Sequence, residues 1–382
     1  MAGIKVILFA NTDWYLYNFR RSLALELQAR GYDVLLISPP GNFGAKLMAL
    51  GLSWKPLTMR RRSLNPLNEF RFLLQLIRLI RREKPALVHG FTIKGAIYGS
   101  IASRIAGVRA RIMSIDGLGY VFTSNDKVAG ILRPVVRMLL RQSLRGGRAK
   151  VILLNSDDVS QFLEDRLARL DQIRLIRGVG VDLNLFSRSS TASTGTPSRV
   201  LLAARLLWDK GVGEYIQACR YLLAQGREIR FLLAGSSDLG NPAAIPEDVI
   251  RAWVNEGIVE WLGHVSDMRA LLGSVDLVVL PSYREGLPTI LVEAAACGLP
   301  LIATDVPGCR EVVTDGADGL LVPVRDARAL ACAIARLTDD RPLAARLGAA
   351  ARRKVELFFD ERIVTQLTLG VYEELLIDVP RR

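Results

Sequence analysis

Short apolar runs alternate with amphipathic helical segments along this chain, and the alternation stops at a polar stretch and then starts again. Strands linked through helices in this way form a parallel sheet that helices cover on both faces. Before the polar stretch, the expected strands are 4–9, 34–37, 86–89, 110–114 and 151–154. After it, they are 200–203, 229–234, 259–262, 277–280, 301–303 and 320–322. The pattern therefore predicts an α/β protein with two Rossmann-like domains.

The polar stretch, residues 188–198, is rich in Ser and Thr and marks a linker between the two domains. We expect an N-terminal domain over 1–187 and a C-terminal domain over 199–350, and two domains suit a length of 382 residues. The helices expected over 351–382 would pack back toward the N-terminal domain. Ligands of open α/β sheets bind beyond the carboxyl ends of the strands, so we expect the domains to face each other across a cleft.

The positive charge is concentrated in the first half of the chain. Residues 1–188 contain 30 Lys and Arg against 13 Asp and Glu, a net charge of +17, whereas the remaining residues carry a net charge of −4. A basic half requires an anionic partner, which could be nucleic acid, phospholipid or a phosphorylated ligand. Nucleic acid is not expected, because no pattern of stacking aromatics and no known nucleic-acid module accompanies the charge.

Two expected helices, 65–84 and 131–145, combine arginines with more apolar surface than a core contact requires. In the second helix the arginines recur at every fourth residue and so lie along one side: Arg133, Arg137, Arg141 and Arg145. Such helices suit an anionic membrane surface, where each Lys or Arg contributes about 1 kcal/mol. The alternative is that they are ordinary surface helices with solvated arginines.

Several functional classes are disfavoured by what the sequence lacks. No apolar run reaches the roughly 18–20 residues of a membrane-spanning helix. The four cysteines show no CxxC spacing, which favours a reducing compartment. The turn after the first strand, NTDWY at 11–15, is not the glycine-rich GxGxxG turn, and no GxxxxGK motif occurs. These two absences argue against nicotinamide dehydrogenases and P-loop NTPases.

The segment 281–300, PSYREGLPTILVEAAACGLP, carries the most informative chemistry. After a strand, a loop presents Glu285 and Gly286, and Pro288 opens a helix that contains Glu293. The first-turn amides of that helix, near 287–290, can bind an anion or sugar hydroxyls. The two carboxylates can accept hydrogen bonds from the hydroxyls of a sugar and of a ribose. A second segment supplies positive charge, because a strand leads to Arg205 and then Lys210, which can both reach a diphosphate.

These motifs resemble those of a known family. Glu285-x7-Glu293, with REGLP before it and GLPLIATDVPG after it, resembles the signature of the retaining GT-B glycosyltransferases of family 4. Arg205-x4-Lys210 resembles the diphosphate clamp of that family, and VGVDLNLF at 179–186 resembles the segment before its linker. Three further motifs resemble a bacterial subgroup that extends saccharides on undecaprenyl diphosphate: NFR at 18–20, HGFTIK at 89–94 and GLGYVF at 117–122.

The resemblance implies a role for each matching residue. Arg205 and Lys210 would hold the leaving diphosphate, Glu293 the ribose hydroxyls, and Glu285 the transferred sugar. Asp116 stands where many members of the family place a His, and it would join Glu285, Arg205 and Lys210 as a catalytic residue. The other donor-binding residues would be His264, Val265, Gly286, Leu287, Pro288 and Thr289. The acceptor-binding residues would be Asp13, Trp14, His89, Lys94, Gly117 and Gly119.

We therefore expect a retaining glycosyltransferase that moves a hexose or N-acetylhexosamine from a nucleotide diphosphate sugar, preferably a UDP-sugar, to a saccharide on undecaprenyl diphosphate. The nucleotide sugar is a co-substrate, and no metal or other cofactor is expected, because preplaced cations can stabilise the diphosphate. The protein would be cytoplasmic and peripheral on the inner face of the cytoplasmic membrane. Two alternatives remain open: a sugar-nucleotide epimerase of the same architecture, and a catalytically silent membrane-associated scaffold.

Overall fold

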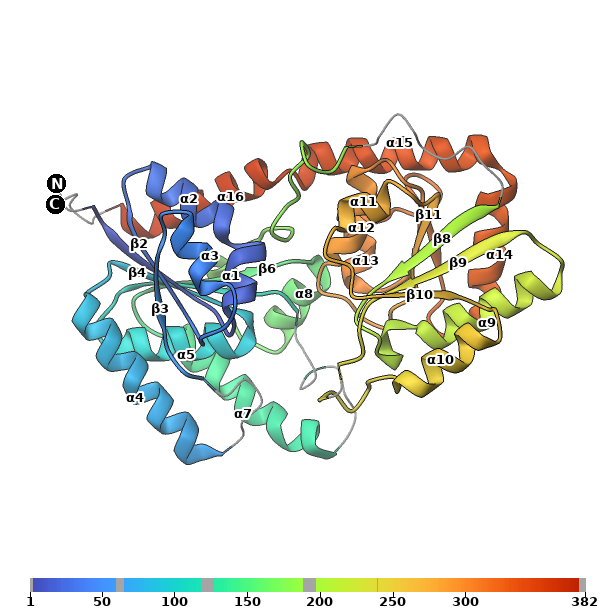
Figure 1. The fold of residues 1–382 in the computed structure, drawn as a ribbon. Helices are drawn as coiled ribbons and strands as arrows, with labels where there is room; N and C mark the ends of the chain where they lie inside the picture. Colours follow the sequence, from blue (N-terminus) through green and yellow to red (C-terminus); the bar gives the residue numbers. More distant parts are fainter. Residues whose placement is uncertain are drawn as a thin grey trace. The chain divides into compact units, whose positions relative to one another are not determined.

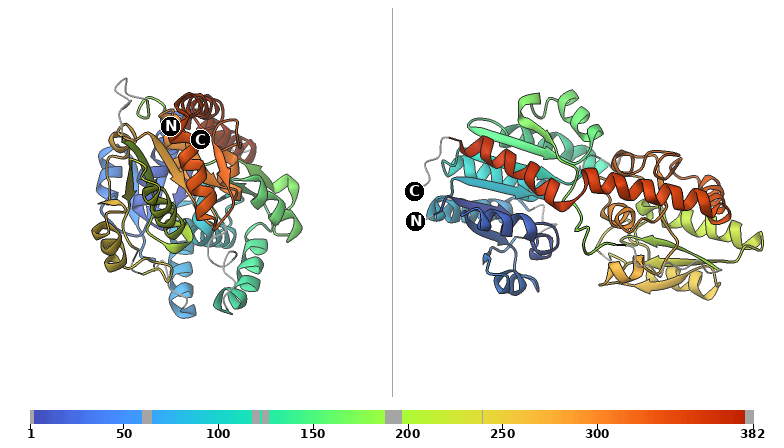
Figure 2. Two further views of the ribbon diagram at one scale, coloured as in Figure 1. Left: turned by 90° about the vertical axis from the view of Figure 1, so that its right-hand side faces the viewer. Right: turned by 90° about the horizontal axis from the view of Figure 1, so that it is seen from above.

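The computed structural model describes residues 3–59, 65–117, 122, 127–187, 197–238 and 240–377, and the chain forms two compact units. Unit 1 consists of residues 1–179 and 362–382, and unit 2 consists of residues 180–361. Each unit contains one parallel β-sheet with helices on both faces (Figures 1 and 2). The two α/β domains predicted from the sequence are therefore present.

The division between the units lies earlier than the predicted boundary at residue 187. The N–H of Val181 donates to the carbonyl of Phe359 at 2.8 Å, and the N–H of Glu361 donates to the carbonyl of Val181 at 3.1 Å. These bonds join the segment after Val179 to unit 2. The predicted linker, 188–198, lies mostly outside the described residues.

The sheet of unit 1 has the strand order β3-β2-β1-β4-β5-β6-β7 among the described residues. Its strands are β1 (Lys5–Phe9), β2 (Asp33–Ser38), β3 (Ser53–Pro56), β4 (Leu87–Phe91), β5 (Ala110–Ile115), β6 (Arg148–Leu153) and β7 (Ile173–Leu175). The central strands are largely buried and mostly apolar because both of their faces are covered, as is usual in parallel sheets. The edge strands β3 and β7 were not predicted, since they are short and partly exposed.

Two layers of helices cover this sheet. The described helices are α1 (Asp13–Phe19), α2 (Arg21–Ala29), α3 (Gly44–Ala49), α4 (Pro66–Glu83), α5 (Thr92–Ile105), α7 (Lys127–Ser143), α8 (Ser156–Glu164), the 3-10 helix η1 (Leu170–Gln172) and α16 (Glu361–Leu376). Helices α4, α5, α7 and α8 pack on one face, and α2 and α16 pack on the other. None of the helices in the described part of the chain is both long and apolar enough to cross a membrane.

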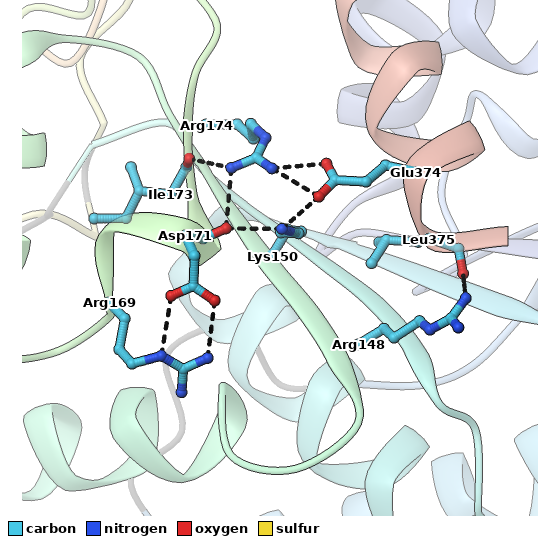
Figure 3. A network of polar contacts seen from close by, with 8 residues as sticks. All are labelled: Arg148, Lys150, Arg169, Asp171, Ile173, Arg174, Glu374 and Leu375. Atoms are coloured by element: carbon cyan, nitrogen blue, oxygen red, sulfur yellow. Dashed lines mark hydrogen bonds and ion pairs between the residues drawn. The ribbon is translucent and has the colours of Figure 1, made fainter. Parts of the chain in front are cut away.

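Helix α16, from the end of the chain, belongs to the core of unit 1. Tyr372 is fully buried, and Glu374 forms ion pairs with Lys150 of β6 at 2.6 Å and with Arg174 of β7 at 2.7 Å (Figure 3). The preceding helix, α15 (Arg341–Phe358), packs in unit 2 instead. Of the segment 351–382, which we expected to pack back toward the N-terminal domain, residues 362–382 therefore belong to unit 1, whereas residues 351–361 belong to unit 2.

The sheet of unit 2 has the strand order β10-β9-β8-β11-β12-β13. Its strands are β8 (Ser198–Ala203), β9 (Ile229–Ala234), β10 (Glu260–Gly263), β11 (Leu277–Leu280), β12 (Leu301–Thr304) and β13 (Leu320–Val322). Its further helices are the 3-10 helix η2 (Trp208–Lys210), α9 (Val212–Ala224), α10 (Glu247–Asn255), α11 (Met268–Leu272), α12 (Thr289–Ala296), α13 (Pro307–Val312) and α14 (Ala327–Asp339). Helices α9, α10 and α14 cover one face, and α11, α12 and α13 cover the other.

Candidate functional site

In unit 2, the loops after β8 and β11 bring a lysine and a glutamate together. The two strands are neighbours and run parallel, so the loops that follow them leave the same edge of the sheet. Lys210 ends η2, and its Nζ donates to Oε1 of Glu285 at 2.6 Å. Both side chains are largely buried. The structure therefore joins two of the residues that the sequence predicted for the donor site.

Backbone contacts fix this pair in position. Gly211, next to Lys210, has a φ of +70°, and a Cβ at this position would overlap the carbonyl oxygen of Pro281. The N–H of Tyr283 donates to the carbonyl of Asp209 at 2.9 Å, and the N–H of Gly308 donates to the carbonyl of Glu285 at 3.2 Å. The loop that carries Glu285 is thus held by η2 on one side and by the start of α13 on the other.

Arg205, the other predicted cation, pairs with a different carboxylate. Its side chain is mostly exposed, and its Nη1 lies 3.3 Å from Oδ2 of Asp238. It extends from the loop immediately after β8, before the chain turns into η2. An exposed arginine on such a loop can swing toward a bound diphosphate, and a guanidinium binds phosphate through two parallel hydrogen bonds.

The start of α12 offers hydrogen-bond donors beside Glu285. The helix begins after Pro288, and no side chain caps it. Uncapped first-turn amides and the positive end of the helix dipole favour an anion or sugar hydroxyls. Gly286, Leu287 and Thr289 lie in this turn or directly before it, as the sequence predicted.

Glu293 lies one helical turn further along α12. Burial raises the pKa of Glu293 to about 7. A carboxylate with this pKa is ionised only in part at neutral pH. A ligand that donates hydrogen bonds to it, such as a ribose, would favour the ionised form.

We predict that Glu293 makes the free energy of unfolding fall as the pH rises. A carboxyl group whose folded pKa lies above its unfolded value contributes stability that is fully present below pH 4.5 and is lost as the pH rises through 7. Glu293→Gln should remove this dependence and stabilise the protein at pH 8 by at most about 3 kcal/mol relative to the wild type. Urea unfolding at pH 5.5 and pH 8 measures the difference. An equal change of stability between these two pH values in both proteins would contradict the prediction.

His264 and Val265 follow the edge strand β10. His264 is exposed, whereas Val265 packs partly against the core. The carbonyl of Gly263 accepts a hydrogen bond from the N–H of Gly235 at 2.7 Å, which ties this loop to the end of β9. Strand β9 lies between β10 and β8, so this loop and the Lys210–Glu285 pair follow the carboxyl ends of strands in the same parallel sheet.

In unit 1, three neighbouring strands end beside one another. The sheet places β1, β4 and β5 in this order, and the loops or helices that follow them carry the residues predicted for the acceptor. Trp14 is 48% exposed and presents its indole at the surface. Lys94 pairs with Glu69 of α4 at 2.9 Å. Gly117 is partly buried, and Gly119 lies outside the described residues.

Asp116, directly after β5, is the centre of a polar cluster that the sequence did not predict. The hydroxyl of Tyr15 donates to Oδ2 of Asp116, and Arg20 lies 3.2 Å from its Oδ1. The guanidinium of Arg20 also donates to the hydroxyl of Tyr15 at 2.6 Å and lies over the ring of Phe91. Burial raises the pKa of Asp116, and the charge of Arg20 opposes this effect. The only sequence signal for Arg20 was its place in the NFR motif, to which no role was attached.

Two residues predicted for the acceptor lie inside unit 1. His89 is buried, with Nδ1 at 2.7 Å from the hydroxyl of Tyr372 and Nε2 at 2.7 Å from Oγ of Ser114. Burial lowers the pKa of His89 well below its ordinary value, so the ring is neutral at pH 7. Asp13 is also buried, and its Oδ2 accepts hydrogen bonds from the N–H groups of Phe43 and Gly44 at 2.7 and 3.0 Å. These contacts give both side chains a structural role, because internal partners satisfy their polar atoms.

Comparisons with known families identify the chain. Residues 185–354 match the family model described as glycosyl transferases group 1, and residues 5–153 match the model described as glycosyl transferase 4-like. This chain is a glycosyltransferase. The predicted membership of a glycosyltransferase family is therefore confirmed. Within the described residues of this glycosyltransferase, no group of three or more His, Cys, Asp or Glu side chains could hold a metal ion.

Several known proteins are similar to this glycosyltransferase. The N,N'-diacetylbacillosaminyl-diphospho-undecaprenol alpha-1,3-N-acetylgalactosaminyltransferase of Campylobacter jejuni is 28% identical over 375 residues, which cover 95% of this chain and 97% of the relative. The UDP-Gal:alpha-D-GlcNAc-diphosphoundecaprenol alpha-1,3-galactosyltransferase of Escherichia coli is 25% identical over 293 residues, 74% of each chain. The structure of Anabaena HepE in complex with UDP and glucose matches 97% of this chain and 100% of its own, with a TM-score of 0.77 and 20% identity. This structural likeness confirms the predicted GT-B fold.

Proposed function

We propose that this glycosyltransferase transfers a hexose or an N-acetylhexosamine from a nucleotide diphosphate sugar to a saccharide on undecaprenyl diphosphate, in the synthesis of a surface polysaccharide. The observation that carries the proposal is the Lys210–Glu285 pair at the carboxyl edge of the sheet in unit 2, beside the start of α12. The names of the two relatives support the lipid-linked acceptor. UDP is the favoured nucleotide, because the Escherichia coli relative is named for a UDP-sugar and HepE binds UDP.

The proposed mechanism follows from the charges that develop in the reaction. Cleavage of the bond between sugar and phosphate places negative charge on the diphosphate and positive charge on the sugar ring. Lys210 and Arg205 would stabilise the diphosphate, and preplaced charges of this kind commonly supply the largest part of catalysis. Glu285 would bind hydroxyls of the transferred sugar, and Glu293 would bind the ribose. Since no side chain in the predicted site is an evident nucleophile, we propose attack of the acceptor on the same face, with retention of configuration.

On the acceptor side, we propose that Asp116 accepts a hydrogen bond from the attacking hydroxyl. Tyr15 and Arg20 are positioning residues in this proposal, because they hold the carboxylate of Asp116 from its buried side. The exposed ring of Trp14 offers an apolar surface for a sugar ring. No metal is required, since the two cations can neutralise the diphosphate.

Association with the cytoplasmic face of the membrane is a further part of the proposal. Helices α4 and α7 of unit 1 carry arginines together with exposed apolar side chains, among them Phe70 and Ile131. A helix of this composition binds anionic lipid surfaces through charge and buried apolar area. Peripheral binding would bring the enzyme to an acceptor that is itself anchored in the bilayer.

Incubation with a panel of nucleotide sugars and a short-chain polyprenyl-diphosphate saccharide tests the proposed function. We expect mass spectrometry to show an acceptor extended by one sugar with one of the donors, and nuclear magnetic resonance to show a retained anomeric configuration. Formation of an epimeric sugar nucleotide in the absence of acceptor would favour an epimerase. Absence of transfer from the whole panel, from a folded protein, would contradict the proposal.

A further inference from the structure

Unit 1 contains an arginine-lined cavity far from the edge of the sheet that carries Asp116. The cavity has a volume of about 470 Å³ and lies where the chain enters β6 and β7. Asp116 follows the carboxyl end of β5. Since β6 runs parallel to β5, the cavity lies at the amino ends of the strands, on the opposite side of the same sheet from Asp116. Four arginines line it, from the last turn of α7, from the segment after α7 and from the segment after α8: Arg141, Arg145, Arg166 and Arg169.

The cations of this cavity are only partly neutralised. Its described lining residues include no Asp or Glu. Arg169 forms a two-point ion pair with Asp171, at 3.0 and 2.9 Å (Figure 3), and Arg141 donates to the backbone carbonyl of Asp165 at 2.7 Å. For Arg145 and Arg166, the described part of the chain shows no carboxylate partner. Neighbouring arginines of which two have no carboxylate partner among the described residues favour a phosphate or a phosphodiester, which guanidinium groups bind through paired hydrogen bonds.

Arg166 occupies a backbone position that normally favours glycine. Helix α8 ends at Glu164, and the N–H of Leu167 donates back to the carbonyl of Phe162 at 2.8 Å, which is the hydrogen bond of a Schellman motif. In this motif the residue after the C-cap adopts the left-handed conformation, and Arg166 has a φ of +50°. An arginine is strained at this position relative to glycine. Its side chain is therefore not explained by the requirements of the turn.

Exposed apolar side chains accompany the arginines. Leu163 lines the cavity, and Leu170, which follows Arg169 in η1, is 71% exposed. Along α7, Ile131, Val135 and Met138 are also exposed, at a spacing that places them on one side of the helix. A site for a small anion in water gains nothing from exposed leucines. The headgroup region of a bilayer stabilises both the cations and the apolar side chains.

We propose that this cavity binds the phosphodiester headgroup of an anionic phospholipid, with Leu163 and Leu170 in contact with the acyl chains. This inference rests on the proposed association with the membrane and gives it a defined lipid site. Helix α7 lies between β5 and the parallel strand β6 in the chain. It therefore runs back across the sheet, from the carboxyl ends of the strands, where Asp116 lies, to their amino ends, where the cavity lies. A lipid in the cavity would place α7 along the membrane surface, with Asp116 near the other end of the helix.

Flotation of the full chain with vesicles tests the lipid site. The vesicles consist of phosphatidylcholine alone or with one third phosphatidylglycerol. We expect binding to the anionic vesicles, and we expect Arg145→Ser with Arg166→Gly to lower the partition coefficient about 25-fold, because each cation at an anionic surface contributes roughly a fivefold factor. Since glycine suits the backbone at position 166, this variant should keep its thermal stability. Leu170→Ser should weaken binding further.

A charge-matched control separates a defined site from general attraction. Arg220→Ser with Arg251→Ser removes two exposed arginines from unit 2 and should change partitioning only slightly. An equal loss of binding in both double variants would overturn the proposal. Release of the protein from the vesicles by inorganic phosphate at constant ionic strength would show a site for free phosphate and would also overturn it. Transfer to a short-chain acceptor in solution should not depend on Arg145 or Arg166, so failure of the lipid site is distinguishable from failure of the proposed function.

Discussion

Replacement of Lys210 by methionine is expected to lower the rate of glycosyl transfer about 100- to 1000-fold, the usual effect of removing one group that stabilises charge in a transition state. Methionine keeps most of the length and the apolar stem of lysine and removes the charge. In the proposed mechanism the diphosphate then leaves without its closest buried cation, and the exposed Arg205 compensates only in part. Initial rates at saturating donor and acceptor measure the effect.

A second ion pair in unit 2 provides a matched control for Lys210→Met. Lys354 lies 3.2 Å from Asp318, with exposed side-chain fractions of 19% and 10%, whereas Lys210 and Glu285 have fractions of 17% and 12%. Lys354→Met leaves a carboxylate in a similar environment without its partner. Both variants should lose about 2 kcal/mol of the free energy of unfolding, but only Lys210→Met should lose activity.

The comparison of the two lysine variants has a clear contrary outcome. If both retained transfer rates within a fewfold range of the wild type, Lys210 would act only in folding. The proposal that it stabilises the diphosphate would then be wrong. If both variants lost activity and both unfolded at the assay temperature, the loss of activity would come from unfolding. The rates would then be measured again below the transition temperature of each variant.

The central strands of both sheets could be predicted from the sequence, and two edge strands could not. Strands such as β1 and β11 are buried on both faces and therefore consist largely of consecutive apolar residues. Strand β3 is mostly exposed and ends in a proline, and β7 contains three residues. An edge strand joins the sheet through backbone hydrogen bonds while many of its side chains face solvent. Its sequence therefore shows no run of apolar residues by which it could be recognised.

The donor side of the site could be predicted better than the acceptor side, for a physical reason. Lys210 and Glu285 each follow a recognisable strand, and the topology of a parallel sheet brings such positions to one edge. The cluster around Asp116 depends on a buried contact with Tyr15, which is distant in the chain. Buried polar partners are chosen by the three-dimensional packing, so no local spacing indicates them. The same limit applies to His89, whose partner Tyr372 comes from the last helix of unit 1.

Replacement of Gly211 by alanine is expected to abolish most activity and to lower the free energy of unfolding by about 3 kcal/mol. Two effects add at this position. The φ of +70° is unfavourable for any residue with a side chain, and the new Cβ would overlap the carbonyl oxygen of Pro281. That carbonyl belongs to the loop that carries Glu285, so the overlap must displace either this loop or Lys210. Separation of the Lys210–Glu285 pair should reduce the rate of transfer even in molecules that remain folded.

Two other glycines of unit 2 separate these effects. Gly226 has a φ of +74°, but a Cβ there would meet no atom within 4 Å, so Gly226→Ala should show the backbone strain alone, about 1 kcal/mol. Gly213, in the first turn of α9, lacks the positive φ, and its Cβ would lie 3.5 Å from the ring of Trp208, an ordinary contact. Gly213→Ala should therefore leave stability unchanged or raise it by up to about 1 kcal/mol.

Urea unfolding and transfer rates of the three variants test this order. If Gly211→Ala lost no more stability than Gly226→Ala and retained its activity, the close contact between η2 and the Glu285 loop would not be needed for catalysis. The rate of glycosyl transfer would then not depend on the geometry that joins Lys210 to Glu285.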